Sequence, residues 1–139
     1  RGLGDVYKRQ VLEAFAAGRV RRLIVTMPPQ HGKSVGASTL LPAYLLGRNP
    51  DLRIAIASYS ASLASKFNRR VQRIIDSPEY AAFFPETTIK RGARPPEYLR
   101  TADEVEIIGH RGGLLSVGRV GALTGNRVDC FILDDLYRK

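Results

Sequence analysis

The apolar positions of this chain fall into two patterns, short continuous runs and longer stretches with helical spacing. Residues 22–26 and 53–57 are short runs rich in Ile, Val and Ala, which are typical of strands buried on both faces of a parallel sheet. Between them, residues 33–46 place apolar side chains at helical spacing, and Pro42 should bend this helix or end its first part. The order strand, helix, strand predicts a βαβ unit, and therefore an α/β fold with a mainly parallel sheet flanked by helices.

A strongly amphipathic helix is predicted for residues 61–76, with Ser60 as its N-cap. Four apolar residues recur at spacings of four, four and three and should face the core: Leu63, Phe67, Val71 and Ile74. Four cations occupy other faces of the same helix, with no acid before Asp76: Lys66, Arg69, Arg70 and Arg73. Such a surface is a candidate for contact with DNA phosphates, and a solvated helix face is the alternative interpretation.

Shorter elements are predicted for the next segment. A helix should begin at residues 77–79 and end at Pro85, with its aromatic residues packed inward: Tyr80, Phe83 and Phe84. Residues 86–103 have a loop-like composition, with four basic residues among Gly92, Pro95 and Pro96. Two short apolar runs, 104–108 and 114–117, then predict an antiparallel hairpin.

Composition narrows the class of protein. The 139 residues are enough for one domain with a hydrophobic core. No apolar run approaches the roughly 18 residues of a membrane span. The lone Cys130 can form no internal disulfide, which suits a reducing compartment. The net charge of +9 predicts a polyanionic partner, with nucleic acid favoured over an anionic membrane surface, and a solvated basic surface is the alternative.

The first candidate site lies where the first apolar run ends. Residues 27–34 have the sequence Met-Pro-Pro-Gln-His-Gly-Lys-Ser, so a strand is followed by a tight loop that ends in Gly-Lys-Ser. In a phosphate-binding loop, the glycine lets backbone N–H groups approach a polyphosphate, the lysine reaches the β and γ phosphates, and the serine hydroxyl coordinates Mg²⁺. Gly32, Lys33 and Ser34 are therefore candidates for binding ATP phosphates, with Ser34 also a metal ligand. Met27 stands where the full motif has its first glycine, and an ordinary strand–turn–helix is the alternative.

A second candidate site follows the last apolar run. Residues 128–135 predict a strand that ends in two consecutive carboxylates. In P-loop NTPases such a strand ends in an acid that holds Mg²⁺, and a following acid can polarise the attacking water as a general base. Asp134 is accordingly the candidate residue on the metal side. The candidate catalytic residues are Lys33 and Asp135, with Asp135 as the base. An Asp-Asp turn after a strand is the alternative interpretation.

Together these stretches resemble a known family, the N-terminal ATPase portion of tailed-phage large terminase subunits. The resemblance covers residues 11–139 and is carried by Pro-Pro-x-His-Gly-Lys-Ser at 28–34, Ala-Ser-Tyr-Ser at 57–60, Ser-Pro-Glu-Tyr at 77–80, Leu-Thr-Gly at 123–125 and Ile-Leu-Asp-Asp at 132–135. It implies a P-loop NTPase of the additional-strand, RecA-like type, in which another strand lies between the two nucleotide-binding strands. It also implies ATP hydrolysis coupled to packaging of double-stranded DNA into procapsids, in the host cytoplasm.

The resemblance further implies cofactors, partners and residue roles. ATP and Mg²⁺ would be the cofactors. Double-stranded DNA, a portal protein, a small terminase subunit and other copies of the chain in a ring would be the partners, with no membrane. Gln30 and His31 would offer loop contacts to the phosphates. Family members often carry Arg at the position of Gln30 and Glu at that of Asp135. In ring motors a neighbouring subunit can supply an arginine to the γ phosphate; Arg119 and Arg127 are candidates, and each is equally compatible with an ordinary surface arginine.

The chain is expected to divide into two parts. Residues 1–10 fit none of the surrounding pattern, and we expect a non-native or disordered N-terminal segment there. Residues 11–139 should be a truncated P-loop ATPase domain whose C-terminal part and nuclease domain lie outside the sequence, so this segment alone should be weakly active or inactive. Two other functions remain open: another nucleic-acid-dependent P-loop ATPase, such as a helicase, and a non-catalytic DNA-binding module with a degenerate P-loop.

Overall fold

The computed structural model describes residues 10, 13–14, 17, 23–27, 33–91, 98–118, 125 and 127–134, and for 23–27, 33–38 and 134 it describes the backbone alone. In chain order the elements of this part are β1 (Leu23–Met27), α2 (Lys33–Arg48), β2 (Arg53–Ala57), α3 (Ala61–Asp76), α4 (Pro78–Phe83), β3 (Glu104–Glu106), β4 (Gly113–Val117) and β5 (Cys130–Asp134). The strand predicted at 53–57 and the helix predicted at 61–76 are confirmed to the residue.

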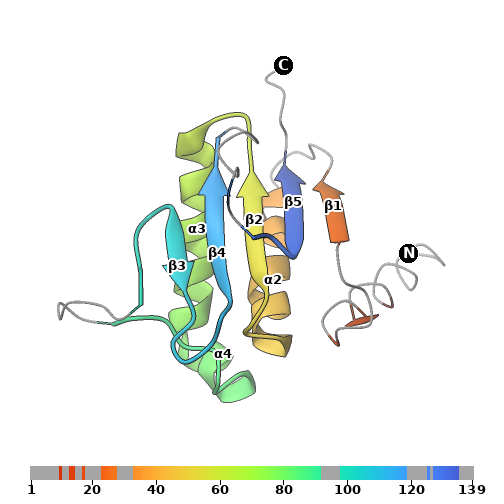
Figure 1. The fold of residues 1–139 in the computed structure, drawn as a ribbon. Coiled ribbons are helices and arrows are strands. Elements are labelled where there is room, and N and C mark those ends of the chain that lie inside the picture. Colours follow the sequence, from red (N-terminus) through yellow and green to blue (C-terminus); the bar gives the residue numbers. More distant parts are fainter. Residues whose placement is uncertain are drawn as a thin grey trace.

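The strands form one sheet in the order β1-β5-β2-β4-β3 (Figure 1). β1, β5, β2 and β4 run parallel, whereas β3 runs antiparallel to β4 at the edge. The α/β class and the mainly parallel sheet are therefore confirmed. The predicted hairpin is confirmed as well, because β3 and β4 pair with Val105 opposite Leu114.

One expectation about the sheet is wrong. The additional-strand arrangement would place another strand between the strand before Gly-Lys-Ser and the strand that ends in the Asp pair. Instead, β1 and β5 pair directly over their whole length, from Leu23 opposite Cys130 to Met27 opposite Asp134. The backbone N–H and C=O groups of two parallel strands satisfy one another in this register, and within the described residues no strand lies between them. The carboxyl ends of β1 and β5 are consequently direct neighbours.

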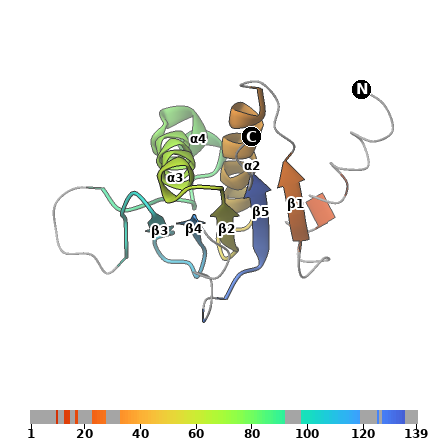
Figure 2. The same cartoon turned by 90° about the horizontal axis from the view of Figure 1, so that it is seen from above.

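The described helices α2, α3 and α4 lie on the same side of the sheet (Figure 2). Fully buried apolar side chains from the helices and the strands fill the space between these two layers: Leu45, Leu46, Ile54, Ile56, Phe67, Val71 and Ile132. Successive side chains of a strand point to opposite faces, so Ile54 and Ile56 mark the helix side of β2. Ala55 and Ala57 lie on the other face of this central strand and are also buried.

The sequence signals of α3 correspond to its observed boundaries and packing. The Oγ atom of Ser60 accepts a hydrogen bond from the Leu63 backbone N–H at 3.1 Å, as expected of an N-cap. Phe67 and Val71 are buried, while Leu63 and Ile74 are partly buried and pack against the core. The predicted apolar stripe is confirmed, and it fixes which side of α3 faces the sheet.

α2 is one continuous segment through Pro42 to Arg48, so Pro42 does not end the helix. A proline removes one backbone donor from a helix interior, which costs about 3 kcal/mol in isolation. The burial of Ala43, Leu45 and Leu46 directly after it supplies the compensating packing.

The inward packing predicted for α4 is correct for two of its three aromatic residues. Tyr80 is buried, and its hydroxyl donates to the Ala43 carbonyl at 2.6 Å. Phe84 packs against the core with its ring centroid 5.1 Å from that of Tyr80. The prediction for Phe83 is wrong, because its side chain is 80% exposed. Phe84 stands directly after α4 as its C-cap and packs inward beside Tyr80, whereas Phe83, the last residue of the helix, is left outside.

Candidate functional site

The carboxyl edge of the sheet brings the two sequence motifs together. β1 ends at Met27, β5 ends at Asp134, and these residues are paired partners. α2 begins at Lys33, so only a short connection separates the end of β1 from the first turn of the helix. The first turn of α2 and the carboxyl ends of β1 and β5 thus lie at the same edge (Figure 1), and these element ends contain Lys33, Ser34 and Asp134. The remaining candidates of the two motifs lie outside the described residues: Gln30, His31, Gly32 and Asp135.

The first turn of α2 carries a positive charge, whereas the N-terminus of a helix favours a negative one. This turn contains Lys33 and no acid. The N-terminus of a helix carries about half a positive charge, so a lysine at that end is unfavourable by itself and an anion is favoured. The electrostatics at this end of α2 therefore favour an anionic ligand such as a polyphosphate.

Two serines to which the sequence assigned no role are buried on neighbouring strands. Ser58 directly follows β2 and has no exposed surface, and Ser116 of β4 is 8% exposed. The Oγ atoms of both lack a hydrogen-bond partner in the part of the chain that the structure describes. A buried hydroxyl without a partner costs about 1–3 kcal/mol. No sequence signal identifies such residues, since a serine in or after a strand is ordinary.

The opposite, amino edge of the sheet carries a mixed cluster of charges. An open hollow of about 520 Å³ is lined there by Asp51, Arg53, Glu106, His110, Arg111, Arg127 and Asp129. The arginine-finger candidate Arg127 lies at this edge, with its Nε 3.7 Å from Asp129 Oδ1 and 75% of its side chain exposed. It precedes the amino end of β5, whereas Asp134 stands at the carboxyl end. Arg119 lies outside the described residues.

The side chain of Asp51, just before β2, contacts the turn between β3 and β4. Its Oδ1 accepts the Arg111 backbone N–H at 3.0 Å and lies 3.3 Å from His110 Nδ1. The hydrogen bond from the Arg111 backbone is the largest cause that lowers the pKa of Asp51, while desolvation acts in the opposite direction. The carboxylate consequently stays charged in more acidic solution than a free aspartate does.

The outer face of α3 carries four exposed cations, here called the cation stripe: Lys66, Arg69, Arg70 and Arg73. Within the described residues, none of the four forms an ion pair. Spacings of three and four make them neighbours on the helix surface, and together they extend about 10 Å along the axis. Like charges so close repel one another, and a polyanion would relieve that repulsion.

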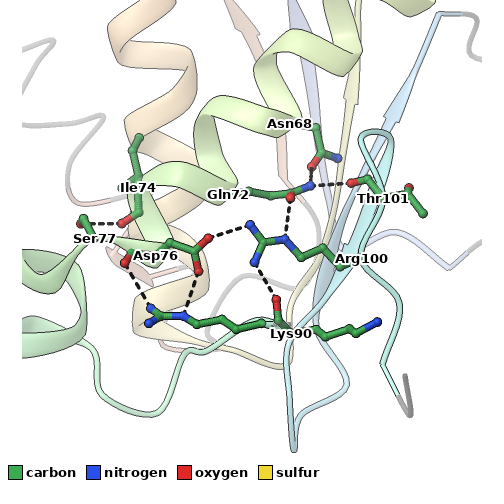
Figure 3. Close-up of polar contacts among 9 residues, drawn as sticks. Asn68, Gln72, Ile74, Asp76, Ser77, Lys90, Arg100 and Thr101 are labelled. Carbon is green, nitrogen blue, oxygen red and sulfur yellow. Dashed lines mark hydrogen bonds and ion pairs between the residues drawn. The ribbon is translucent and has the colours of Figure 1, made fainter. Parts of the chain in front are cut away.

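The side of α3 that faces the hairpin carries a polar ladder that the sequence did not reveal (Figure 3). Asn68 Nδ2 donates to the carbonyls of Asp103 at 3.0 Å and Leu114 at 3.2 Å. Gln72 Nε2 donates to Asn68 Oδ1 and to the Thr101 carbonyl, both at 2.7 Å. The two amides therefore fasten α3 to the segment that enters β3 and to β4 itself.

Arg100 completes this network at the end of α3 (Figure 3). Its guanidinium donates to Asp76 Oδ2 at 2.6 Å, to Gln72 Oε1 at 3.0 Å and to the Lys90 carbonyl at 2.6 Å. The second partner of Asp76 is Arg91, whose Nε lies 3.2 Å from Oδ1 and whose side chain is 65% exposed. The acid that ends α3 thus pairs with two arginines, and no acid among the described residues pairs with the cation stripe.

Comparison with protein families decides the class of this chain. A family model described as "Terminase large subunit, T4likevirus-type, N-terminal" matches residues 24–138. The chain belongs to this terminase family. The resemblance seen in the sequence is thereby confirmed, and membership indicates a role in phage DNA packaging. Searches against curated proteins and against solved structures found no match.

The terminase match includes every element that carries a candidate residue. It runs from β1 through β5, so it covers both motifs at the carboxyl edge, the cation stripe and the polar ladder. Terminase large subunits are generally ATPase motors. Among the described helices of this terminase chain, none is long and apolar enough to cross a membrane.

Proposed function

We propose that this chain is the ATP-hydrolysing motor part of a phage terminase large subunit, which packages double-stranded DNA into procapsids. The observation that carries the proposal is the direct pairing of β1 with β5, which joins their carboxyl ends at the edge where α2 begins. A P-loop NTPase needs the phosphate loop and the metal-side acid at one edge of its sheet. Family membership supports the same function.

The proposed phosphate contacts come from the connection between β1 and α2. The Gly32 backbone and the Lys33 ammonium bind the β and γ phosphates, and Gln30 and His31 add contacts from the loop. The N-terminus of α2 favours the same anion, and its first turn has no acid to repel it. These features fit the polyphosphate of ATP.

The proposed metal side consists of the Ser34 hydroxyl and the Asp134 carboxylate. Hydroxyl and carboxylate oxygens are the hard ligands that Mg²⁺ prefers, so this pair fits the cation that accompanies ATP. When bound, Mg²⁺ would neutralise charge on the β and γ phosphates. Asp135 holds the attacking water and accepts its proton as general base. Arg119 and Arg127 are candidates for contact with a neighbouring subunit's nucleotide in an assembled ring.

The proposed DNA contact is the cation stripe of α3. Its four charges are exposed and unopposed within the described residues, and each neutralised phosphate releases counterions into solution. The stripe lies on a helix that the polar ladder fastens to the sheet, so a force on the DNA would act on a firmly held element. A portal protein, a small terminase subunit and further copies of the chain are the proposed protein partners, in the host cytoplasm.

ATP turnover by the full-length protein, with and without double-stranded DNA, tests this function beside a Lys33→Ala variant. We expect DNA-stimulated turnover in the wild type and loss of turnover in the variant, because the variant lacks the cation that faces the γ phosphate. DNA binding without turnover in a folded wild type would instead indicate the non-catalytic module. Strand separation in place of packaging into procapsids would indicate a helicase.

A charge-matched pair of variants tests the DNA surface. One variant replaces the four residues of the cation stripe by Gln, and the control replaces four exposed arginines elsewhere: Arg48, Arg53, Arg111 and Arg127. Both lose the same net charge. We expect the first variant to weaken DNA binding more and to reduce the slope of log affinity against log salt by up to about 3–4, as four lost phosphate contacts require. Equal effects in both variants would refute a localised contact.

A further inference from the structure

Ser58 is an unexplained polar group beside the proposed nucleotide edge. Its side chain has no exposed surface, and its Oγ lacks a hydrogen-bond partner in the described part of the chain. With no exposed surface, this hydroxyl does not contact bulk solvent. Because an unsatisfied buried hydroxyl destabilises the folded state, a hydrogen bond that forms when the site is loaded would remove this penalty.

The register of the sheet places a candidate acceptor beside Ser58. β2 and β5 are parallel neighbours in which Ile56 stands opposite Ile132, and both belong to the core on the helix side. Two residues further along the chain stand Ser58, directly after β2, and Asp134, the last residue of β5, and strand alternation assigns both positions to that face. Neighbouring strands are about 4.8 Å apart, a separation that a hydroxyl and a carboxylate can bridge. Ser58 is therefore next to the position of the proposed metal-side acid.

We propose that the Ser58 hydroxyl donates a hydrogen bond to the Asp134 carboxylate and thereby orients this carboxylate toward the Mg²⁺ that accompanies bound ATP. This inference rests on the proposed function. Ser58 is a positioning residue, since it acts through Asp134 and touches neither nucleotide nor cation. An acid held in one orientation presents its second oxygen in a fixed direction, and partners of this kind contribute strongly to metal affinity.

The local structure holds Ser58 in place for this role. Its backbone N–H donates to the Val117 carbonyl at 3.2 Å, which continues the pairing of β2 with β4 beyond Ala57. Two residues later, Ser60 caps α3 through its bond to the Leu63 N–H. A backbone held between a strand and a helix cap fixes the position of the Ser58 side chain before the bond forms.

Ser116 provides a matched control within the same sheet. Its Oγ is also buried and also lacks a partner in the described residues. However, Ser116 stands opposite Ile56 on β4, and β2 separates β4 from β5. The two serines share the missing hydrogen bond, and only Ser58 adjoins the position of Asp134.

The test measures how binding of a fluorescent non-hydrolysable ATP analogue to the full-length protein depends on Mg²⁺, together with urea unfolding of the nucleotide-free protein. The variants are Ser58→Ala, Ser58→Thr and Ser116→Ala, with Lys33→Ala as the control that abolishes nucleotide binding. We expect Ser58→Ala to raise the Mg²⁺ concentration at half-saturation about 10- to 100-fold. Ser58→Thr should restore it, because it keeps a hydroxyl, and Ser116→Ala should leave it unchanged. Neither alanine variant should lower the unfolding midpoint, because each removes an unsatisfied group.

Each other outcome overturns the inference in a distinguishable way. A wild-type Mg²⁺ dependence in Ser58→Ala refutes the positioning role while the proposed function stands. An equal shift in Ser116→Ala indicates a general packing effect. A lower unfolding midpoint in Ser58→Ala, together with a wild-type Mg²⁺ dependence, shows that the hydroxyl bonds to another partner in the nucleotide-free protein. A wild type that binds no analogue refutes the proposed function, and this inference with it.

Discussion

Replacing Arg100 by Met probes the network at the end of α3. Methionine keeps the apolar stem of the side chain and removes the guanidinium, with its bonds to Asp76, Gln72 and the Lys90 carbonyl. The comparison variant is Arg91→Met, which removes the other partner of the same acid. The two arginines differ in burial, with 27% of the Arg100 side chain exposed and 65% of that of Arg91.

The expected magnitude follows from what each variant leaves unpaired. Without Arg100, Gln72 Oε1 loses its hydrogen bond inside a side chain that is only 6% exposed, at a cost of about 1–3 kcal/mol. Loss of the partly buried ion pair with Asp76 adds to this cost, although Arg91 still pairs with the Asp76 carboxylate. We expect a total loss of about 2–4 kcal/mol in the free energy of unfolding. Arg91→Met breaks an exposed pair and should cost about 0–1 kcal/mol.

Urea unfolding followed by circular dichroism measures both losses, at low and at high salt. High salt should remove most of the small effect of Arg91→Met, because exposed charges are screened. The effect of Arg100→Met should persist, since most of it comes from an unsatisfied buried oxygen. Equal losses in the two variants, or a loss in Arg100→Met that high salt abolishes, would refute this account of the network.

Two further predictions concern titrating groups. Burial, with a smaller contribution from the Asp129 charge, raises the pKa of Cys130 to about 12. We therefore expect iodoacetamide to modify the native thiol about 1,000-fold more slowly than a free cysteine near pH 8, as followed by mass spectrometry, and to modify it readily in urea; rapid modification of the native protein would contradict this. Because the pKa of Asp51 is lowered from 3.8, its stabilising effect is present above that value and is lost as pH falls through the lower folded-state pKa. Asp51→Asn should slightly lower the thermal unfolding midpoint near neutral pH and not in strong acid, and a deficit that persists in strong acid would contradict this reasoning.

Local patterns were sufficient to predict the long elements. The helix that follows Ser60 was predicted to the residue, because helical spacing over sixteen positions and a capping serine agree. Phe83 was placed wrongly, since a helix of six residues has too few positions to define an inner face. The strand that the family resemblance implied between β1 and β5 is absent from the described residues, and strand order depends on pairing between distant segments. Register of this kind leaves no local mark in a sequence.

The sequence likewise reveals only those parts of the candidate site whose signals are local. Gly-Lys-Ser and the Asp pair could be picked out in the sequence because each is a chemical signal confined to a few residues, and their roles stay predictions. Asn68 and Gln72 were visible as two amides four residues apart beside apolar positions of α3, which could have indicated a buried polar ladder. Their main partners are backbone carbonyls of segments that follow α4, and only the fold brings these into contact.

The pairing of β1 with β5 sets the order in which the chain can fold on a ribosome. β1 is synthesised before the other described strands, yet the strand that satisfies its backbone groups begins only at Cys130. At roughly 5–20 residues per second, synthesis from Leu23 to Cys130 takes at least about 5 s. Throughout that time β1 is an apolar strand with an unpaired edge, the feature most prone to pair with another chain. β2 can pair with β4 before β5 exists, so the sheet can grow from β2 and β4, and β1 joins last.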